Sequence, residues 1–81
     1  MKIVVKLHAQ LKKHLPAEAK GVTQMDLPDG ATVADVVARL GIPPKYAGMM
    51  VSGEEHLQLA SVLRDGQEVN VFPPLAGGVG P

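Results

Sequence analysis

The sequence predicts an α+β domain in which a small mixed sheet of four to five strands packs on one main helix. Several short segments alternate between apolar and polar residues and are separated by turn residues, a pattern typical of strands. Residues 32–41 instead repeat their apolar positions with a helical period. Packing that helix on one face of the sheet is the simplest way to bury its apolar stripe.

The composition indicates one domain with an aliphatic core. The 81 residues leave room for a single modest core, and a hydrophobic fraction of 46% is typical of a folded chain. Phe72 and Tyr46 are the only aromatic residues, so Val, Leu, Ile and Met must fill the interior. Eight basic and eight acidic residues give zero net charge, which provides no general attraction to nucleic acid or anionic membranes. We expect neither as a partner.

Cysteine is absent, which excludes a disulfide framework, a thiolate metal site and a cysteine nucleophile. No apolar run approaches the length of a membrane span, and the N-terminal segment lacks a signal-peptide cleavage pattern. We therefore expect a cytoplasmic protein.

The first elements are predicted from alternation and from turn residues. Residues 2–8 alternate as a half-buried strand, and residues 9–15 favour a short helical turn that ends before Pro16. Residues 21–27 alternate more weakly and are predicted as the second strand. The turn sequence of residues 28–30 closes this strand.

The helix has the clearest signals. Thr32 is a candidate N-cap, and Asp35 stands three residues later, as in a capping box. Gly41 suits the position after the last helical residue, and Pro43 follows as a breaker. The apolar stripe consists of Val33, Val36, Val37 and Leu40. These signals predict a helix that packs on the sheet.

The second half predicts three further strands, over residues 46–51, 56–59 and 68–72, while residues 60–63 fit no single element. This order of elements fits a β-grasp (ubiquitin-like) fold. In that fold the first and last strands lie side by side and parallel, joined by a crossover that contains the helix. The chain after the last strand would then leave from the centre of the sheet.

We divide the chain into a β-grasp domain, residues 1–72, and a flexible C-terminal tail with a double glycine, residues 73–81. Pro73 and Pro74 lack N–H groups and cannot continue a central strand. Gly77 and Gly78 have no Cβ and could enter a channel too narrow for other residues. Six residues from Pro73 to Gly78 reach roughly 20 Å when extended. The alternative is an ordinary frayed terminus.

The run LRDGQEVNVFPPLAGG, residues 63–78, resembles the C-terminal signature of the MoaD/ThiS family of ubiquitin-like sulfur carriers. The family includes the small subunit of molybdopterin synthase and the carrier of thiamine biosynthesis. The segments KIVVKLHAQL, LPDGATVADVVARLGI and VSGEE agree with it, so the resemblance covers nearly the whole chain. Its most specific part is the FPP stem followed by the double glycine.

The resemblance implies a carrier and not an enzyme. In that family an E1-like adenylyltransferase uses ATP and magnesium to adenylate the C-terminal glycine carboxylate, and sulfur then replaces AMP to give a thiocarboxylate. The reacting carboxyl would be that of Gly78, next to Gly77, and a synthase large subunit would accept the sulfur. The chain itself would bind no cofactor. The expected partner-binding residues are Val4, Phe72, Pro73, Pro74, Leu75 and Ala76.

Val79-Gly80-Pro81 departs from this pattern, because the free carboxylate as written belongs to Pro81 and not to Gly78. An amide between Gly78 and Val79 cannot be adenylated as a carboxylate. We expect a tail-processing peptidase to cleave after Gly78. An extension that is not native is the alternative.

Two functional classes stay open. The first is a sulfur carrier, for molybdopterin or else for thiamine, cysteine or another pathway; the FPP stem favours molybdopterin. The second is a ubiquitin-like protein modifier or interaction module. A β-grasp fold serves both classes and does not decide between them.

Strand parity turns Val4 and Phe72 to the outer face of the sheet, where they are predicted to form a small apolar patch, with Met50 as a further candidate. Single exposed apolar residues are also ordinary.

The three histidines, His8, His14 and His56, lie on different predicted elements, so we expect no metal site. The cluster of residues 12–14 is interpreted as a solvated helix face, with docking to an acidic partner as the alternative.

Overall fold

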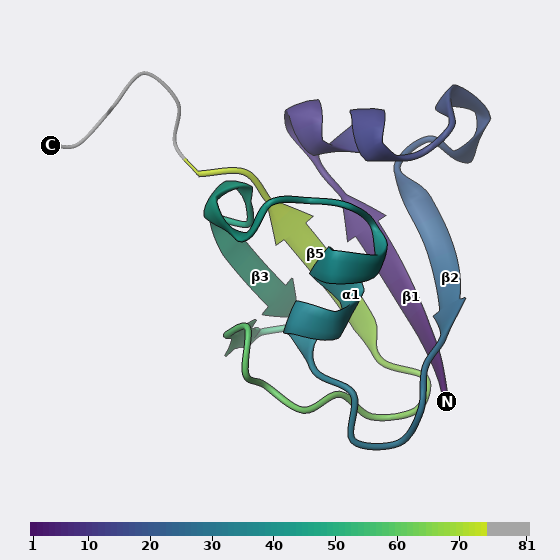
Figure 1. The fold of residues 1–81 in the computed structure, drawn as a ribbon, viewed down its shortest axis with the longest axis vertical. Helices are drawn as coiled ribbons and strands as arrows, with labels where there is room; N and C mark the ends of the chain where they lie inside the picture. Colours follow the sequence, from purple (N-terminus) through teal and green to yellow (C-terminus); the bar gives the residue numbers. More distant parts are fainter. Residues whose placement is uncertain (75–81) are drawn as a thin grey trace, which may run out of the picture.

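The structure is a computed structural model that describes residues 1–74. A five-stranded sheet lies on one α-helix, and three short 3-10 helices join the strands (Figure 1). The strands are β1 Lys2–Leu7, β2 Val22–Asp26, β3 Met49–Ser52, β4 Glu55–Leu57 and β5 Glu68–Phe72. The helices are η1 Ala9–His14, η2 Ala17–Ala19, α1 Val33–Arg39 and η3 Pro44–Tyr46.

The strand order is β2-β1-β5-β3-β4, which confirms the β-grasp arrangement. β1 and β5 are parallel neighbours, and every other pair in the sheet is antiparallel. The register places Val5 beside Val69 and Leu7 beside Val71. Because β5 is the central strand, the chain after Phe72 leaves from the middle of the sheet, as predicted.

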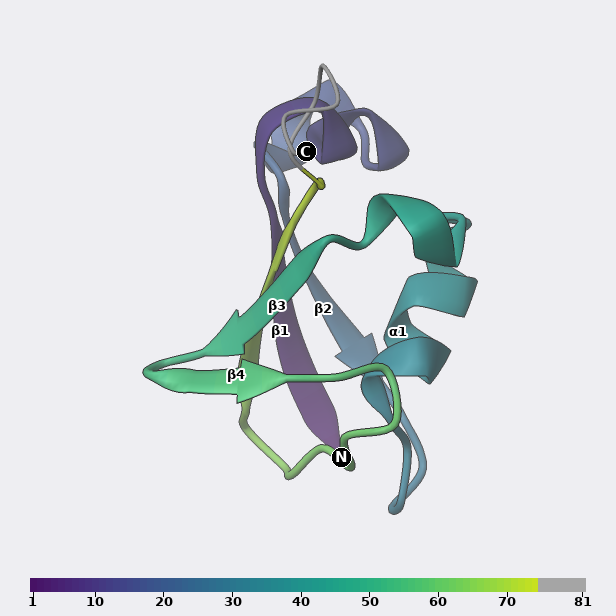
Figure 2. The same ribbon diagram turned by 90° about the vertical axis from the view of Figure 1, so that its left-hand side faces the viewer.

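The core lies between the sheet and α1, which covers one face of the sheet (Figure 2). Alternate residues of β1 and β5 point into it and are buried, whereas their neighbours are half-buried or exposed. Within residues 1–74 no buried side chain is polar or charged. The buried side chains are all aliphatic, and the largest of them with almost no exposed surface are Ile3, Val5, Leu7, Leu11, Val33, Val36, Val37, Val69 and Val71.

Both ends of α1 are capped as the sequence predicts. The Asp35 carboxylate accepts hydrogen bonds from the Thr32 N–H at 2.8 Å and from the Thr32 hydroxyl at 3.2 Å. At the other end the Gly41 N–H donates to the Ala38 carbonyl and the Ile42 N–H to the Val37 carbonyl, each at 3.1 Å. This is the Schellman pattern, and Gly41 holds the left-handed conformation, φ +73°, that the pattern needs.

Several predicted boundaries were wrong. The third strand begins at Met49 rather than at residue 46, because Pro43 and Pro44 start a 3-10 turn that includes Tyr46. The fourth strand covers residues 55–57 instead of 56–59. Residues 60–63, which fitted no single element in the sequence, form no helix or strand; Val62 makes an isolated bridge with Thr32, and Leu63 is buried in the core.

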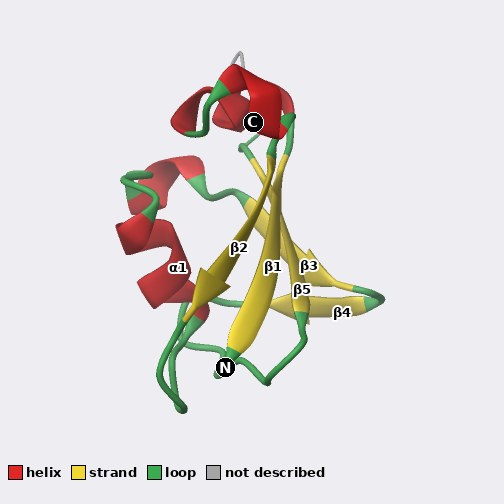
Figure 3. Cartoon of the chain, turned by 90° about the vertical axis from the view of Figure 1, so that its right-hand side faces the viewer, coloured by secondary structure: helices red, strands yellow, loops and turns green. Residues whose placement is uncertain are grey.

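The segment after β1 forms 3-10 turns, and these gather at the end of the sheet from which β5 leaves (Figure 3). Leu11 is buried there and ties η1 to the core. Within the described residues, no helix is long and apolar enough to span a bilayer.

Candidate functional site

The start of the tail is the candidate site, and its direction is set by two backbone hydrogen bonds. On one side of β5 the His8 N–H donates to the Val71 carbonyl at 3.1 Å. On the other side the Gly48 N–H donates to the Phe72 carbonyl at 2.8 Å. β5 is therefore held on both sides up to its last residue, and Pro73 and Pro74 then continue without a place in the sheet.

The Phe72 ring stacks on the imidazole of His8. Their centroids are 4.2 Å apart and the planes differ by 8°. His8 Nε2 lies 2.9 Å from the Asn70 side-chain oxygen, which fixes the orientation of the imidazole. The half-buried Phe72 is thus held on the outer face of the sheet immediately before the two prolines.

The apolar patch predicted from Val4 and Phe72 does not form. The parallel register places Val4 beside Glu68, at the opposite end of β5 from Phe72. Met50 is also excluded, because its side chain is only 7% exposed and belongs to the core. Met49, which is 43% exposed, pairs with Phe72 instead. The alternation along each strand predicted the correct face of the sheet for Val4 and Phe72. Which side chains lie next to each other on that face depends on the register between the strands.

Gly48, Met49, Phe72, Pro73 and Pro74 line a groove of about 410 Å³ whose walls are largely apolar. Gly48 keeps this groove open. A Cβ on Gly48 would meet the backbone of Pro73 and Pro74 at less than contact distance. The groove and the stem of the tail therefore depend on a residue without a side chain.

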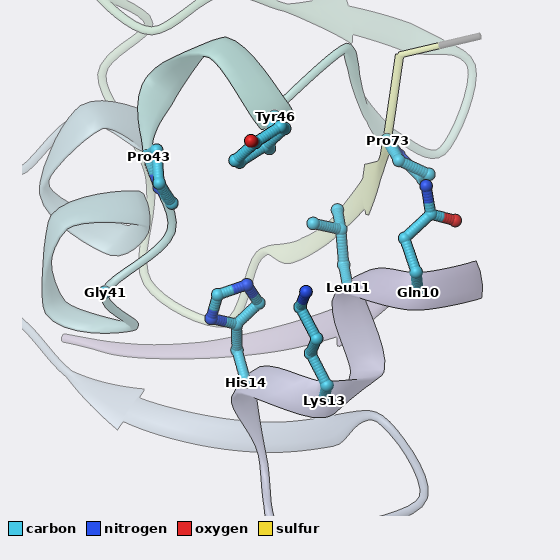
Figure 4. Close-up of a pocket in the computed structure, with 8 residues that line it drawn as sticks. All are labelled: Gln10, Leu11, Lys13, His14, Gly41, Pro43, Tyr46 and Pro73. Atoms are coloured by element: carbon cyan, nitrogen blue, oxygen red, sulfur yellow. The ribbon is translucent and has the colours of Figure 1, made fainter. Parts of the chain in front are cut away.

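A second pocket, of about 460 Å³, lies on the other side of Pro73, between η1 and the segment that follows α1 (Figure 4). The side chains of Lys13, His14 and Tyr46 lie around it, with Leu11 and Pro43 as apolar walls. Gln10 and Gly41 complete the lining. No carboxylate is among the residues that line this pocket in the described part of the chain.

On the outer face of the sheet, Lys6 Nζ lies 3.2 Å from the Glu68 carboxylate. Hydrogen bonding from Lys6, and secondarily from Asn70, holds the pKa of Glu68 below its ordinary value of 4.5. Both side chains are partly exposed, so this is an ordinary surface ion pair with a modest effect on stability.

The reactive residues predicted from the sequence, Gly77 and Gly78, lie outside the described residues, as do Leu75, Ala76 and residues 79–81. Phe72, Pro73 and Pro74 are described, and they lie together at the exit of β5. Within residues 1–74 no group of three His, Asp or Glu side chains is placed to hold a metal ion.

A model of the ThiS family matches residues 5–78 of the chain, from β1 to the double glycine. The chain belongs to the ThiS family. The match ends at Gly78, so residues 79–81 lie beyond the part that the family model covers.

Solved structures show the same fold as this ThiS-family protein. Small archaeal modifier protein 1 from Haloferax volcanii shares 22% identity, with a TM-score of 0.69, over 96% of this chain and 100% of that one. A Pyrococcus furiosus protein assigned as subunit 1 of a molybdopterin converting factor shares 23% identity, with a TM-score of 0.69, over 93% of this chain and 99% of that one. No curated protein matches the sequence.

ThiS and MoaD proteins are small carriers and are not themselves enzymes, and they generally partner with E1-like activating enzymes and synthase large subunits. Sequence reasoning found the stem in this ThiS-family chain but missed His8 and Gly48 as its supports. The signal for His8 was the alternation of residues 2–8, which continues one residue beyond β1 and turns His8 to the same outer face as Lys6. Gly48 lies inside the strand predicted over residues 46–51, where an isolated glycine can indicate a bulge or the close approach of another backbone, and this signal was overlooked.

Proposed function

We propose that this protein is a sulfur carrier whose Gly78 carboxylate, once residues 79–81 have been removed, is adenylated and then converted to a thiocarboxylate. The observation that supports this most directly is the continuity of three parts: a central strand, a stem without backbone donors at Pro73 and Pro74, and a double glycine where the family match ends. The chain delivers the carboxyl group and supplies no catalytic side chain.

The chemistry needs only the carboxylate and two co-reactants. A Gly78 carboxylate oxygen attacks the α-phosphorus of ATP in the activating enzyme, and pyrophosphate leaves. Hydrosulfide released by a sulfur donor then attacks the carbonyl carbon, the C–O bond to AMP breaks, and AMP leaves with the electron pair. The product is the thiocarboxylate, and no oxidant or reductant is needed. A glycine at this position leaves the carbonyl uncrowded for this second attack.

Removal of residues 79–81 is part of the proposal, because an internal amide has no oxygen that can take the adenylate. A peptidase that cleaves after Gly78 would expose the required carboxylate. Intact mass after incubation with native extract, or with a JAMM-type metallopeptidase, tests this step. ATP-dependent AMP formation by a chain that keeps all 81 residues would contradict it.

We place the sulfur transfer in molybdopterin synthesis, with a synthase large subunit as acceptor. The FPP stem and the similar fold of the Pyrococcus furiosus protein support this assignment. Thiamine, cysteine or another pathway is the alternative within the same chemistry.

A protein-modifier role is the second candidate, and the fold of the Haloferax volcanii modifier protein favours considering it. The two roles separate after activation. A carrier ends as a thiocarboxylate that a synthase consumes, whereas a modifier ends as an isopeptide with a lysine of another protein.

The deciding experiment uses a chain that ends at Gly78, incubated with an E1-like enzyme, ATP, magnesium and a sulfur donor. A mass increase that corresponds to replacement of one oxygen by sulfur supports the carrier. Isopeptide conjugates without that product support the modifier. In a matched chain, replacing Gly78 with a bulky residue is expected to abolish the reaction and leave thermal stability nearly unchanged.

A further inference from the structure

The zero net charge of the chain conceals a strong separation of charge between its two ends. At the end from which the tail leaves, residues 8–21, 40–48 and 72–74 carry four lysines against one glutamate, a formal charge of +3. The turns at the opposite ends of the strands, within residues 1–2, 26–35 and 53–67, carry six carboxylates against one lysine and one arginine, a formal charge of −4. The tail therefore leaves from the cationic end.

These lysines are free to meet a partner. Lys12, Lys13, Lys20 and Lys45 are all exposed. The ion pairs found within residues 1–74 are Lys6 with Glu68 and Arg64 with Glu55, and neither involves this end.

The 460 Å³ pocket beside Pro73 is embedded in this cationic end. Its rim presents the Lys13 ammonium and the imidazole of His14, and its walls include Leu11, Pro43 and Tyr46 (Figure 4). Lys45 adds a further cation 5.2 Å from the centre of the Tyr46 ring. Such a pocket suits a carboxylate side chain on an otherwise apolar segment and disfavours a basic one.

We propose that the pocket, with Lys13, His14 and Tyr46 in its lining and Lys45 beside it, binds an acidic segment of the E1-like activating enzyme. This inference rests on the proposed function, because it needs a partner that encloses Gly78. Six residues from Pro73 to Gly78 can reach at most roughly 20 Å, even when fully extended, so such a partner must also cover the surface next to Pro73. An acidic surface there would be steered to the tail end and away from the acidic end.

The test uses a charge reversal at the pocket, Lys13→Glu, and a matched charge reversal at the acidic end, Lys2→Glu. Both lysines are exposed, and both variants change the net charge equally. Binding of the E1-like activating enzyme is measured without the sulfur donor, so that the measurement does not depend on sulfur transfer. We expect Lys13→Glu to weaken binding about tenfold at low salt and Lys2→Glu to leave it within about twofold. In about 0.5 M salt the difference should largely disappear.

Tyr46 provides an internal probe, because it is the only tyrosine and is 47% exposed at the pocket. Fluorotyrosine labelling of the carrier gives a single fluorine resonance that should shift when the enzyme binds. Lys13→Arg should retain both the shift and the affinity. Equal effects of the two charge reversals, or an unshifted resonance in the bound carrier, would overturn the proposal. So would a shift produced by RNA or inorganic phosphate but not by the enzyme.

Failure of this inference can be distinguished from failure of the proposed function. If the chain ending at Gly78 becomes a thiocarboxylate but Lys13→Glu does not weaken binding of the activating enzyme, the docking surface is wrong and the carrier role stands. If binding depends on Lys13 and on salt but no thiocarboxylate forms, the docking surface stands and the sulfur chemistry is wrong.

Discussion

The backbone of Pro74 passes so close to Gly48 that no other residue fits at position 48 without displacing the tail. A Cβ there would lie 2.8 Å from the carbonyl carbon of Pro73 and closer still to Pro74. Gly48 also donates its N–H to the Phe72 carbonyl at 2.8 Å. Gly48 and Pro74 are 26 positions apart in the sequence, and together they fix where the tail begins.

Replacing Gly48 with alanine is therefore expected to redirect the tail without unfolding the domain. The obstructed segment leads out of the domain, so the free energy of unfolding should change by less than about 1 kcal/mol. Misplacing the stem should lower kcat/KM for thiocarboxylate formation by about tenfold or more. Urea unfolding and initial rates measure the two quantities.

Gly66→Ala is the control for Gly48→Ala. Gly66 has φ +80° and lies in the turn before β5, away from the tail. The Gly66→Ala variant should lose about 1 kcal/mol of unfolding free energy, with little change in kcat/KM for thiocarboxylate formation. A Gly48→Ala chain that reacts as fast as the wild type would show that the tail direction does not matter.

His8 is expected to support Phe72 energetically, because their rings stack at 4.2 Å. A double-mutant cycle with His8→Ala and Phe72→Ala should give a coupling energy of about 0.5–1 kcal/mol in urea unfolding. A second cycle, with Val4→Ala in place of His8→Ala, should give a coupling energy to Phe72 of less than about 0.3 kcal/mol, because Val4 lies beside Glu68 and not beside Phe72. Equal couplings in the two cycles would contradict the register.

The sequence predicted those parts of the molecule whose determinants are local. The helix was found from Thr32, Asp35 and Gly41, because a cap, a stripe and a stop all lie within ten residues. The boundaries of β5 were also correct, since alternation ends where Pro73 removes the next donor.

The supports of the stem were missed because they depend on pairing between distant strands. The neighbours of Phe72 follow only from the registers of β5 with β1 and β3, and a shift of register would replace both His8 and Met49. The late start of β3 was missed for a different reason. Residues 46–48 have no pattern that distinguishes a strand from the end of a 3-10 turn.

The capping box of α1 gives a further prediction. In Asp35→Ala, the N–H and hydroxyl of Thr32 both lose their acceptor, which should cost about 1 kcal/mol of unfolding free energy. Asp29→Ala in the preceding turn is the control, because no side-chain hydrogen bond of Asp29 occurs within residues 1–74. Similar losses in the two variants would indicate a general charge effect instead of a cap.

The ion pair between Lys6 and Glu68 predicts a dependence of stability on pH. The pKa of Glu68 in the folded state lies below its ordinary value of 4.5, chiefly because Lys6 donates a hydrogen bond to the carboxylate. A lowered folded-state pKa stabilises the fold above the unfolded value, and this contribution is lost as the pH falls through the folded value. Carbon-detected NMR titration should therefore give a Glu68 pKa below 4.5 in the wild type and a higher value in Lys6→Met. The stability difference between the two proteins should shrink as the pH falls from neutral through the folded-state pKa of Glu68, because the carboxyl is protonated in both states below that pKa. A difference that stays constant over this range would mean that Lys6 stabilises the fold through packing alone.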